Sequence, residues 1–275
     1  MKHILVPVDF SEGSVNALEM AIAFANHMNF NVRMIHVIKD SVFYQKNLNL
    51  SNLVEIKNEK VIHNLKTLVS QYATEVKNTI DYRIRSGKVY NEIANQAKYG
   101  EAELITIGAH GTSGFEELWL GNNAYKVVNN SPCPVMSVRN SYKRHQIQRI
   151  VLPIDDTPET RQKIPYTAYV AKQFGAQLHL LQVSETKKES VLERINEYCN
   201  QAASFLANNN LDFVVEKIIG NNLTDITIDY SMRTDADLIS IMTEQSESTK
   251  NIWLGPYAQQ MVNHSPIPVL SIQPY

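Results

Sequence analysis

Cysteine and long apolar runs are scarce in this chain of 275 residues. The two cysteines, Cys133 and Cys199, lie far apart and outside any zinc-like spacing, so we expect free thiols in a reducing, cytoplasmic setting. The N-terminal segment MKHILVPVDF does not fit a signal peptide, because Pro7 and Asp9 interrupt its apolar run. No apolar run approaches the roughly 20 residues of a membrane span, so no membrane partner is expected.

An excess of charge of either sign is also missing. The 26 Lys and Arg residues and the 28 Asp and Glu residues leave a net charge of −2, with both signs scattered along the chain. Nucleic-acid-binding proteins usually carry a basic patch, so no nucleic-acid partner is expected. The hydrophobic content of 44% is ample for a core, and the length suggests one large domain or two ordinary ones.

The chain repeats itself. Three segments recur in the same order, namely residues 3–14 at 149–160, residues 31–37 at 176–183, and residues 118–138 at 252–272. Such a repeat predicts two copies of one domain of about 140 residues. We expect a first domain at residues 1–140 and a second at 148–275, with the polar, basic segment 139–148 as the linker.

Short apolar runs alternate with helical patterns in each copy. In the first copy the pattern predicts strands at 3–8, 32–37, 80–85, 104–108 and 134–138, and helices at 14–28, 53–76, 89–99 and 122–130. Strand–helix alternation predicts right-handed βαβ crossovers and a parallel sheet with helices on both faces. The predicted fold is α/β, with two tandem doubly wound parallel five-stranded sheets of the Rossmann-like kind.

Three segments of the first copy are expected at the ligand-binding edge of its sheet, where strands end and their order reverses. They are Pro7-Val8-Asp9 after the first strand, residues 36–38 after the second, and the glycine-rich segment 108–121 after the fourth. Val37 offers an apolar wall for a base, and the peptide groups around Val8 and Asp9 offer hydrogen bonds. The Asp9 carboxylate can accept from an amine or a ribose hydroxyl.

The glycine-rich segment suits phosphate groups. Gly108 and Gly111 have no β-carbon, so their main chain can approach bulky anionic oxygens. Gly121 opens the next helix, whose free N–H groups and positive dipole end favour phosphate. Asn122 and Asn123 add amide donors at that helix start.

These residues also have purely structural interpretations. Glycines after a strand often only turn the chain, Asp9 with Ser11 can cap the first helix, and Asn122 is an ordinary N-cap residue. His110 fits either a plain loop position or a ligand contact. The sequence contains no zinc spacing, catalytic triad, carboxylate pair or P-loop, so neither metal ligands nor catalytic residues are predicted.

The segments ILVPVDFS (4–11) and IGAHGTSGFEELWLGNNA (107–124) together resemble the universal stress protein family. Gly108-x2-Gly111-x9-Gly121 matches the glycine spacing of its nucleotide-binding members, which carry Ser or Thr where this chain has Asn122. The resemblance covers almost the whole chain, as two tandem domains, and implies a fold of the adenine nucleotide alpha hydrolase-like group.

The resemblance also implies a ligand. The Asp and Val that match Asp9 and Val37 flank adenine in that family, and the glycine loop with the following helix start holds the phosphates. ATP or a related adenine nucleotide, with Mg²⁺ bridging its phosphates, is the implied cofactor.

The second copy departs from the glycine motif. The residues that match Gly108, Gly111 and Gly114 are Met242, Gln245 and Ser248. Glu244 and Glu247 in the same loop would repel a polyphosphate. Pro256, which follows Gly255, has no N–H to offer. We therefore expect the second copy to have a degenerate site.

Two functions stay open. The first is a stress-response regulatory protein that binds the nucleotide in its N-terminal domain. Its C-terminal domain would be a non-binding pseudo-dimer partner, joined through the final strands at 134–138 and 268–272. Any ATP hydrolysis should be slow, because no positioned base or arginine finger is evident near the loop.

The second is a nucleotide-independent interaction scaffold. Segment 39–56, with Phe43, Tyr44 and Leu48, would then be a partner-binding arm or a lid, although a packed helical insertion explains it equally well. An unidentified protein partner and a further homodimer fit either function. An adenylating or pyrophosphatase enzyme is disfavoured, because VDFSEGS does not match the loop such enzymes carry after strand one.

Overall fold

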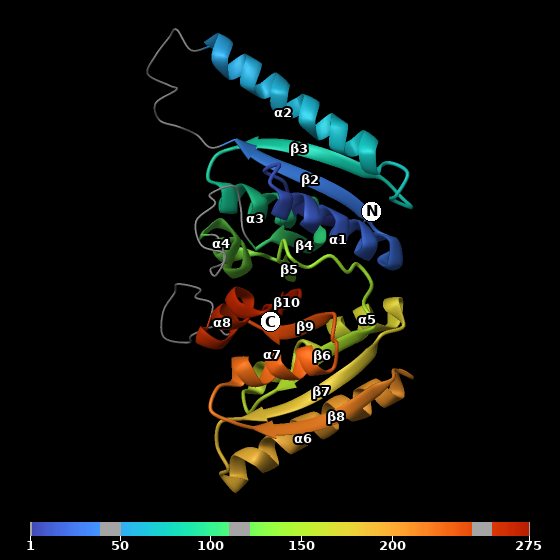
Figure 1. The fold of residues 1–275 in the computed structure, drawn as a ribbon, viewed down its shortest axis with the longest axis vertical. Helices are drawn as coiled ribbons and strands as arrows, with labels where there is room; N and C mark the ends of the chain where they lie inside the picture. The colour runs from blue at the N-terminus through green and yellow to red at the C-terminus, as the bar shows by residue number, and fades with distance from the viewer. Residues whose placement is uncertain (1, 39–50, 110–121, 244–254, 275) are drawn as a thin grey trace.

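The computed structural model describes residues 2–38, 51–109, 122–243 and 255–274. Their strands form one ten-stranded sheet in the order β3-β2-β1-β4-β5-β10-β9-β6-β7-β8. The first half of the molecule supplies β1 to β5 and the second half supplies β6 to β10. Figure 1 shows the two halves end to end, with helix α2 at one extremity and helix α6 at the other.

The first half alternates strands and helices as predicted. Its elements are β1 (His3–Pro7), α1 (Glu12–Met28), β2 (Asn31–Ile38), α2 (Ser51–Tyr72), β3 (Ile80–Ser86), α3 (Val89–Gly100), β4 (Ala102–Gly108), α4 (Asn122–Asn130) and β5 (Val135–Val138). Each expected strand and helix of the first copy is confirmed, with ends shifted by a few residues. The α/β fold class predicted from the sequence is therefore confirmed.

The second half repeats this order with one change. Its elements are β6 (Arg149–Ile154), the 3₁₀ turn η1 (Pro158–Arg161), α5 (Ile164–Phe174), β7 (Gln177–Ser184), α6 (Glu189–Asn208), β8 (Phe213–Ile219), α7 (Leu223–Arg233), β9 (Leu238–Met242), α8 (Pro256–His264) and β10 (Val269–Ile272). Where the first half begins a long helix soon after its first strand, the second half makes a short turn and begins its helix later.

Local chemistry sets the ends of helix α1. The Ser11 hydroxyl accepts a hydrogen bond from the Ser14 N–H at 3.2 Å, which satisfies one of the free donors at the helix start. Asn29 ends the helix in a left-handed conformation, with φ of 57°. Leu18, Ile22 and other residues spaced three or four apart are buried, so the helix packs an apolar face into the core.

The two five-stranded sheets meet edge to edge. Strands within each half pair in parallel, whereas β5 and β10 pair antiparallel, with Met136 opposite Leu270. Both side chains are fully buried. The pairing places the final strands of the two copies at the junction and removes two open sheet edges.

Helices also join the halves. The ring of Phe174 in α5 lies 4.8 Å from the ring of Phe24 and 4.1 Å from that of His27, both in α1, measured between ring centroids. These contacts bring the first helix of each half together beside the β5–β10 junction.

The expected linker, residues 139–148, is anchored rather than loose. The Asn16 amide in α1 donates hydrogen bonds to the carbonyls of Arg139 and Tyr142, each at 2.9 Å. The buried Tyr142 hydroxyl donates to the carbonyl of Asp237 at 3.3 Å. The segment thus packs against both halves and ties one to the other.

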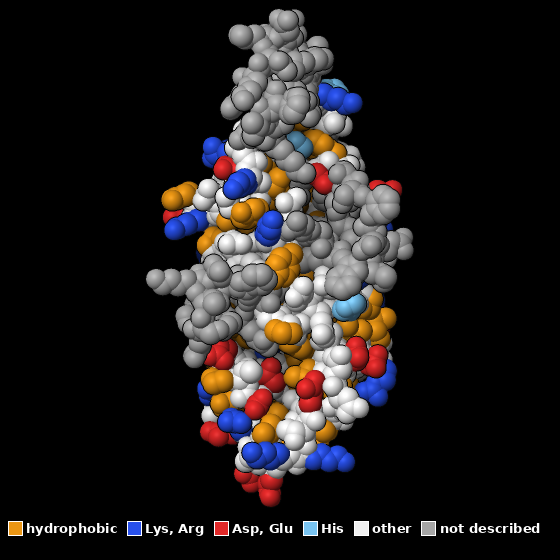
Figure 2. Space-filling model, turned by 90° about the vertical axis from the view of Figure 1, so that its left-hand side faces the viewer, with side chains coloured by type: hydrophobic (Ala, Val, Ile, Leu, Met, Phe, Trp, Pro, Cys, Tyr) orange, Lys and Arg blue, Asp and Glu red, His pale blue; other side chains and the backbone are white. Residues whose placement is uncertain are grey.

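The surface carries charges of both signs. Figure 2 shows Lys, Arg, Asp and Glu side chains intermixed over the second half on the face that it presents. Among the residues described, no helix is long and apolar enough to cross a membrane. Most of segment 39–56, the proposed arm or lid, lies outside the described residues, and its last residues begin helix α2.

Candidate functional site

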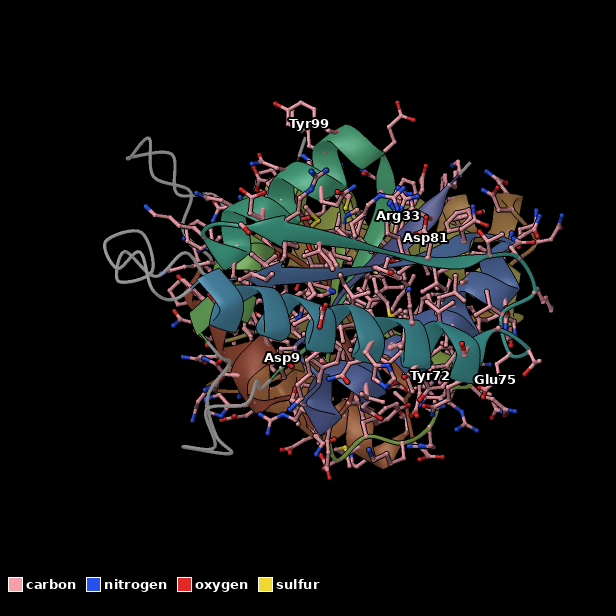
Figure 3. All side chains as sticks on the ribbon, turned by 90° about the horizontal axis from the view of Figure 1, so that it is seen from above. Asp9, Arg33, Tyr72, Glu75, Asp81 and Tyr99 are labelled. Atoms are coloured by element: carbon pink, nitrogen blue, oxygen red, sulfur yellow. The ribbon has the colours of Figure 1, made fainter. Side chains whose placement is uncertain are left out.

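The strand order of the first half reverses between β1 and β4, which are neighbours with α1 on one side and α3 and α4 on the other. Ligand-binding crevices of doubly wound sheets lie at the carboxyl ends of such strands. Figure 3 shows Asp9 at this end of the sheet, and the Arg33–Asp81 ion pair (2.6 Å) further toward the opposite end.

The structure describes part of the predicted site. Six of the predicted residues are described in full, namely Pro7, Val8, Asp9, Val37, Gly108 and Asn123. Asn122 begins helix α4, and only its backbone is described. His110, Gly111 and Gly121 lie outside the described residues, so their places stay predictions. Those that are described come from the ends of β1, β2 and β4 and the start of α4.

The Asp9 carboxylate helps to start helix α1. Its Oδ1 accepts hydrogen bonds from the Ser11 N–H at 3.1 Å and from the Ser11 hydroxyl at 2.5 Å. Asp155 makes the same two contacts with Thr157 in the second half, at 2.9 and 2.5 Å. Since both halves share this arrangement, it belongs to the fold and does not by itself mark a ligand site. Ser11 is the N-cap of α1 and Asp9 supports it through these two bonds, while the role of Asp9 toward a base stays a prediction.

The Val8 peptide is engaged inside the protein. Its N–H donates to the Ile35 carbonyl at 2.9 Å, and its carbonyl lies 2.7 Å from the His36 Nδ1. His36 must therefore carry its proton on Nδ1 to donate this bond. The contact ties the end of β1 to the end of β2, and a base in this crevice would take its N–H donor from another group.

An aromatic pair that the sequence pattern did not predict lies at the ends of β1 and β2. The rings of Phe10 and His36 stack with 5.0 Å between centroids and 28° between planes. Phe10 holds a φ of 68°, a left-handed conformation that bulky residues rarely adopt. Neither the pairing nor this backbone angle leaves a trace in apolar periodicity, which is why the sequence pattern missed it.

The second half lacks this pair. Asp156 stands in the place of Phe10 and forms an ion pair with Arg194 at 3.0 Å. Gln182 stands in the place of His36 and is buried, with its amide 3.4 Å from the Asn196 side-chain oxygen. An aromatic surface next to the crevice is therefore a property of the first half.

Gly108 has a packing reason to be glycine. A β-carbon on Gly108 would lie 2.7 Å from the carbonyl oxygen of Gly13 and 2.8 Å from its carbonyl carbon. The first turn of α1 thus rests directly on the end of β4. The second half has Met242 and Glu159 in these two places, Met242 is buried, and the chain there forms η1 instead of a helix start. The first half therefore has both glycines and an early helix start, and the second half has neither.

A buried lysine marks the second half. Lys163, aligned with Ala17, donates from its Nζ to the Thr160 carbonyl at 2.7 Å and to the Thr160 hydroxyl at 3.0 Å. Burial lowers the pKa of Lys163 to about 8, although the nearby Asp155 carboxylate opposes the shift. A positive charge is thus enclosed under the end of β6, where the first half has a methyl group.

The last helix of each half also differs at its start. Helix α4 begins at Asn122, which has a backbone N–H, whereas α8 begins at Pro256, which has none. Because free N–H groups at a helix start are what bind anions, α4 has a donor that α8 lacks.

Metal-binding clusters and ionised thiols are absent from the described residues. These residues hold no cluster of three His, Cys, Asp or Glu side chains able to bind a metal ion. Both cysteines are free, as predicted. Burial raises the pKa of the Cys133 thiol to about 11 and also raises that of Cys199, so both thiols stay protonated and unreactive at neutral pH.

The ten-stranded sheet, built from two doubly wound halves, defines a tandem protein of the Rossmann-like α/β class. The model of the universal stress protein family matches residues 1–139 and again residues 146–273. The chain therefore belongs to the universal stress protein family, and carries two copies of its domain.

Known proteins agree with this assignment. The universal stress protein YxiE of Bacillus subtilis is 32% identical over 144 residues, which is 50% of this chain and 97% of that protein. A universal stress protein of Archaeoglobus fulgidus has a crystal structure that covers 98% of both chains with a TM-score of 0.77 at 19% identity, so it supports the tandem fold alone. A universal stress protein solved in complex with cAMP matches 46% of this chain at 16% identity and a TM-score of 0.39, too distant to bear on the ligand here.

Proposed function

We propose that this protein is a stress-response regulator that binds ATP or a related adenine nucleotide in the crevice of its first half. The second half would be a structural partner without a nucleotide. The observation that supports this most is the contrast between the two crevices, which share a fold and differ in the residues that would meet the ligand.

The base end of the crevice supports the proposal first. The Phe10–His36 stack and the half-buried Val37 give the first half an aromatic and apolar surface beside the strand ends. Asp9 is exposed at the same edge. A flat, hydrophobic base with polar edges fits such surroundings. In the second half an ion pair, Asp156–Arg194, stands where Phe10 would be.

The phosphate end supports it second. Helix α4 starts beside the end of β4 with a peptide N–H at Asn122, and Asn123 is exposed on its first turn. Peptide N–H groups and the positive end of a helix dipole bind phosphate. The proposed site uses Gly108, Gly111 and Gly121 to keep the main chain open, with His110 and Mg²⁺ as further contacts to the phosphates.

The first experiment is a titration of the purified protein with ATP, with and without Mg²⁺, followed by the thermal unfolding midpoint. A ligand that binds only the folded state adds about 2.7 kcal/mol of stability at a concentration 100 times its Kd, so the midpoint should rise steadily. A flat midpoint at millimolar ATP would refute nucleotide binding.

Paired variants locate the site. Asn122→Pro gives α4 the residue with which α8 already begins, so the helix should fold while the N–H donor is lost. We expect the ATP-dependent rise in midpoint to disappear. Gly111→Glu should have the same effect, whereas Gln245→Glu, at the matching place in the second half, should leave the rise unchanged. A rise that survives in both first-half variants would show that the phosphates bind elsewhere.

A further inference from the structure

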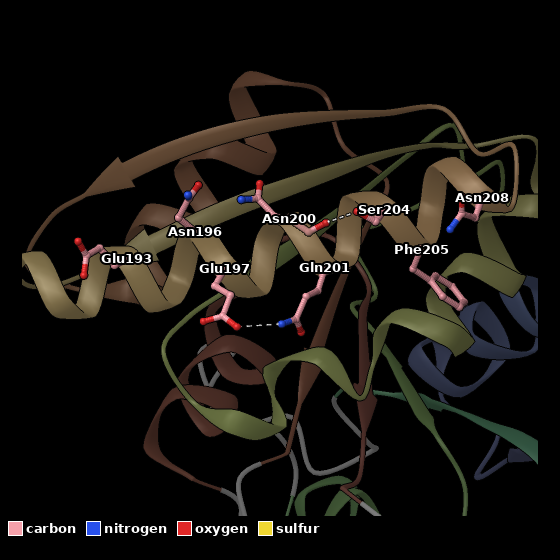
Figure 4. Close-up of a pocket in the computed structure, with 8 residues that line it drawn as sticks. All are labelled: Glu193, Asn196, Glu197, Asn200, Gln201, Ser204, Phe205 and Asn208. Atoms are coloured by element: carbon pink, nitrogen blue, oxygen red, sulfur yellow. Dashed lines mark hydrogen bonds between the residues drawn. The ribbon is translucent and has the colours of Figure 1, made fainter.

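The second half contains a cavity that is lined by none of the residues of the proposed nucleotide site. It lies between turn η1 and helix α6 and has a volume of about 360 Å³, within the range of about 300–1,000 Å³ typical of small-molecule sites. A shallower hollow of about 690 Å³ along α6 adjoins it and shares Gln201 and Phe205. Figure 4 shows Glu197, Gln201 and Phe205 along the side of α6 that faces the neighbouring segment, with Asn196 and Asn200 on the other side.

The cavity exists because the second half begins its helix late. Pro158 opens η1 and Pro165 occupies the first turn of α5, so the chain between them forms a short turn and not a continuous helix. In the first half, the Tyr72 hydroxyl of α2 donates to the Glu19 carboxylate of α1 at 2.8 Å and bridges the two helices. Glu19 aligns with Pro165, whose side chain cannot accept a hydrogen bond, and Pro165 lines the cavity instead.

The walls of the cavity are largely apolar. Ile164 and Ala202 are buried at its base, and the Phe205 side chain, which is 38% exposed, stands at its rim. Pro158 and Pro165 complete the apolar lining. An exposed aromatic ring beside a hollow is the kind of surface that a ligand covers.

Arg161 supplies a charge without a counter-ion. Its Nη1 donates to the Gln201 side-chain oxygen at 2.5 Å, and its guanidinium lies 4.2 Å from the centre of the Tyr198 ring. Its Nε is enclosed and has no hydrogen-bond partner, and no ion pair joins Arg161 to a carboxylate in the described part of the chain. Arg194, on the same helix as Gln201, is by contrast paired with Asp156 at 3.0 Å.

We propose that this cavity binds a small monocarboxylate with an apolar body. The carboxylate would pair with Arg161, whose planar guanidinium matches its two oxygens, and the body would cover Ile164 and Phe205. A phosphate dianion fits less well, because the Glu197 carboxylate, which accepts a hydrogen bond from the Gln201 amide at 3.2 Å, brings negative charge to the rim. The site does not depend on nucleotide binding by the first half.

Octanoate is a suitable probe, with 1-octanol as the same chain without the charge. Isothermal titration calorimetry of the full-length protein should show one octanoate per chain, bound at least tenfold more tightly than 1-octanol. Arg161→Gln should weaken octanoate by about tenfold and leave 1-octanol unchanged. Phe205→Ala should weaken both ligands alike, because both cover the ring.

Arg194→Gln is the matched control, since it removes a neighbouring arginine that already has a carboxylate partner. It should leave octanoate binding unchanged. Thermal midpoints of the unliganded variants show whether each still folds, and Arg161→Lys, which keeps a charge but not the planar pair of donors, gives an intermediate affinity if the site is as proposed. Equal affinities for octanoate and 1-octanol, equal losses in both arginine variants, or a solvated groove without saturable binding would each overturn the proposal.

Discussion

Phe10 is one of the described residues of the first half that hold a left-handed backbone conformation, together with Asn29 and Glu101. A left-handed φ costs a residue with a β-carbon roughly 1–2 kcal/mol, and the structure retains it at the crevice, where the ring stacks on His36. Strained residues of this kind often lie at functional sites. Asp156, in the equivalent place, does not have a positive φ.

This strain predicts an unusual order of stabilities. Phe10→Ala loses the ring and keeps the strain, whereas Phe10→Gly loses the same ring and relieves it. The glycine variant should therefore be the more stable of the two, by about 1 kcal/mol, in urea unfolding at neutral pH. If the alanine variant were equally stable, the left-handed conformation would carry no cost.

The buried Lys163 should make the free energy of unfolding depend on pH. Its folded-state pKa, about 8, lies below the unfolded value near 10.5, so the unfolded chain binds more protons between these limits. The free energy of unfolding should therefore rise from pH 8 to pH 10.5 through this group, by about 3 kcal/mol at most.

Lys163→Met is the comparison for that measurement. The variant has no group to titrate at this position, so the gap between the two unfolding free energies should shift in favour of the unmodified protein as the pH goes from 7 to 10. A gap that is constant from pH 7 to pH 10 would contradict the assignment of the pKa. Both proteins are followed by urea unfolding at each pH.

At the scale of elements, the contact between α1 and β4 depends on glycine. A β-carbon on Gly108 would meet the backbone of Gly13, which cannot move unless the helix moves, so Gly108→Ala should cost about 1–3 kcal/mol. Urea unfolding measures this directly.

Gly100 is the natural control. Its β-carbon would lie 2.7 Å from the Gln96 side-chain nitrogen, which is the end of a side chain and not part of the backbone. Gly100 also ends helix α3, where alanine is the better helix former. Gly100→Ala should be neutral or slightly stabilising, and a loss as large as that of Gly108→Ala would contradict the packing argument.

Sequence patterns predicted the elements of the first copy, whereas several features near the proposed site left no trace in those patterns. Strands such as β4 and helices such as α1 follow from apolar spacing, which is local and survives in any fold. The late start of α5, the enclosed Lys163 and the Phe10–His36 stack depend on contacts between segments far apart in the chain. The spacing of Gly108 predicted an open main chain, and the neighbour that fills part of that space, Gly13, belongs to another element.

Each half of the molecule donates hydrogen bonds to the C-terminal end of the last helix of the other half. Arg139, after β5, donates to the Asn263 carbonyl at the end of α8. Gln273, after β10, donates to the carbonyls of Val128 and Asn129 at the end of α4, at 3.0 and 3.2 Å. Arg139 aligns with Gln273 and Asn263 with Asn129, so the two contacts are related by the pseudo-two-fold symmetry of the halves.

The two contacts differ in charge, because Arg139 is a cation and Gln273 is neutral, and this difference should affect the free energy of unfolding. Hydrogen bonds from a charged group contribute about 1.5–3 kcal/mol and those between neutral groups about 1 kcal/mol, and a cation also suits the negative end of a helix. Gln273 donates two neutral hydrogen bonds, worth about 2 kcal/mol together, and the charged bond from Arg139 to Asn263 is worth about 1.5–3 kcal/mol. Arg139→Ala should therefore destabilise the protein at least as much as Gln273→Ala in urea unfolding. A clearly smaller loss in Arg139→Ala would mean that the charge on Arg139 adds nothing at the junction.

The antiparallel pairing of β5 with β10 takes place within one polypeptide. Dilution therefore cannot separate the halves. Every molecule carries one first-half site and one second-half site, whatever the protein concentration. If only one crevice is competent, occupancy should follow a plain hyperbola at any protein concentration, without the cooperativity open to a reversible pair of identical subunits.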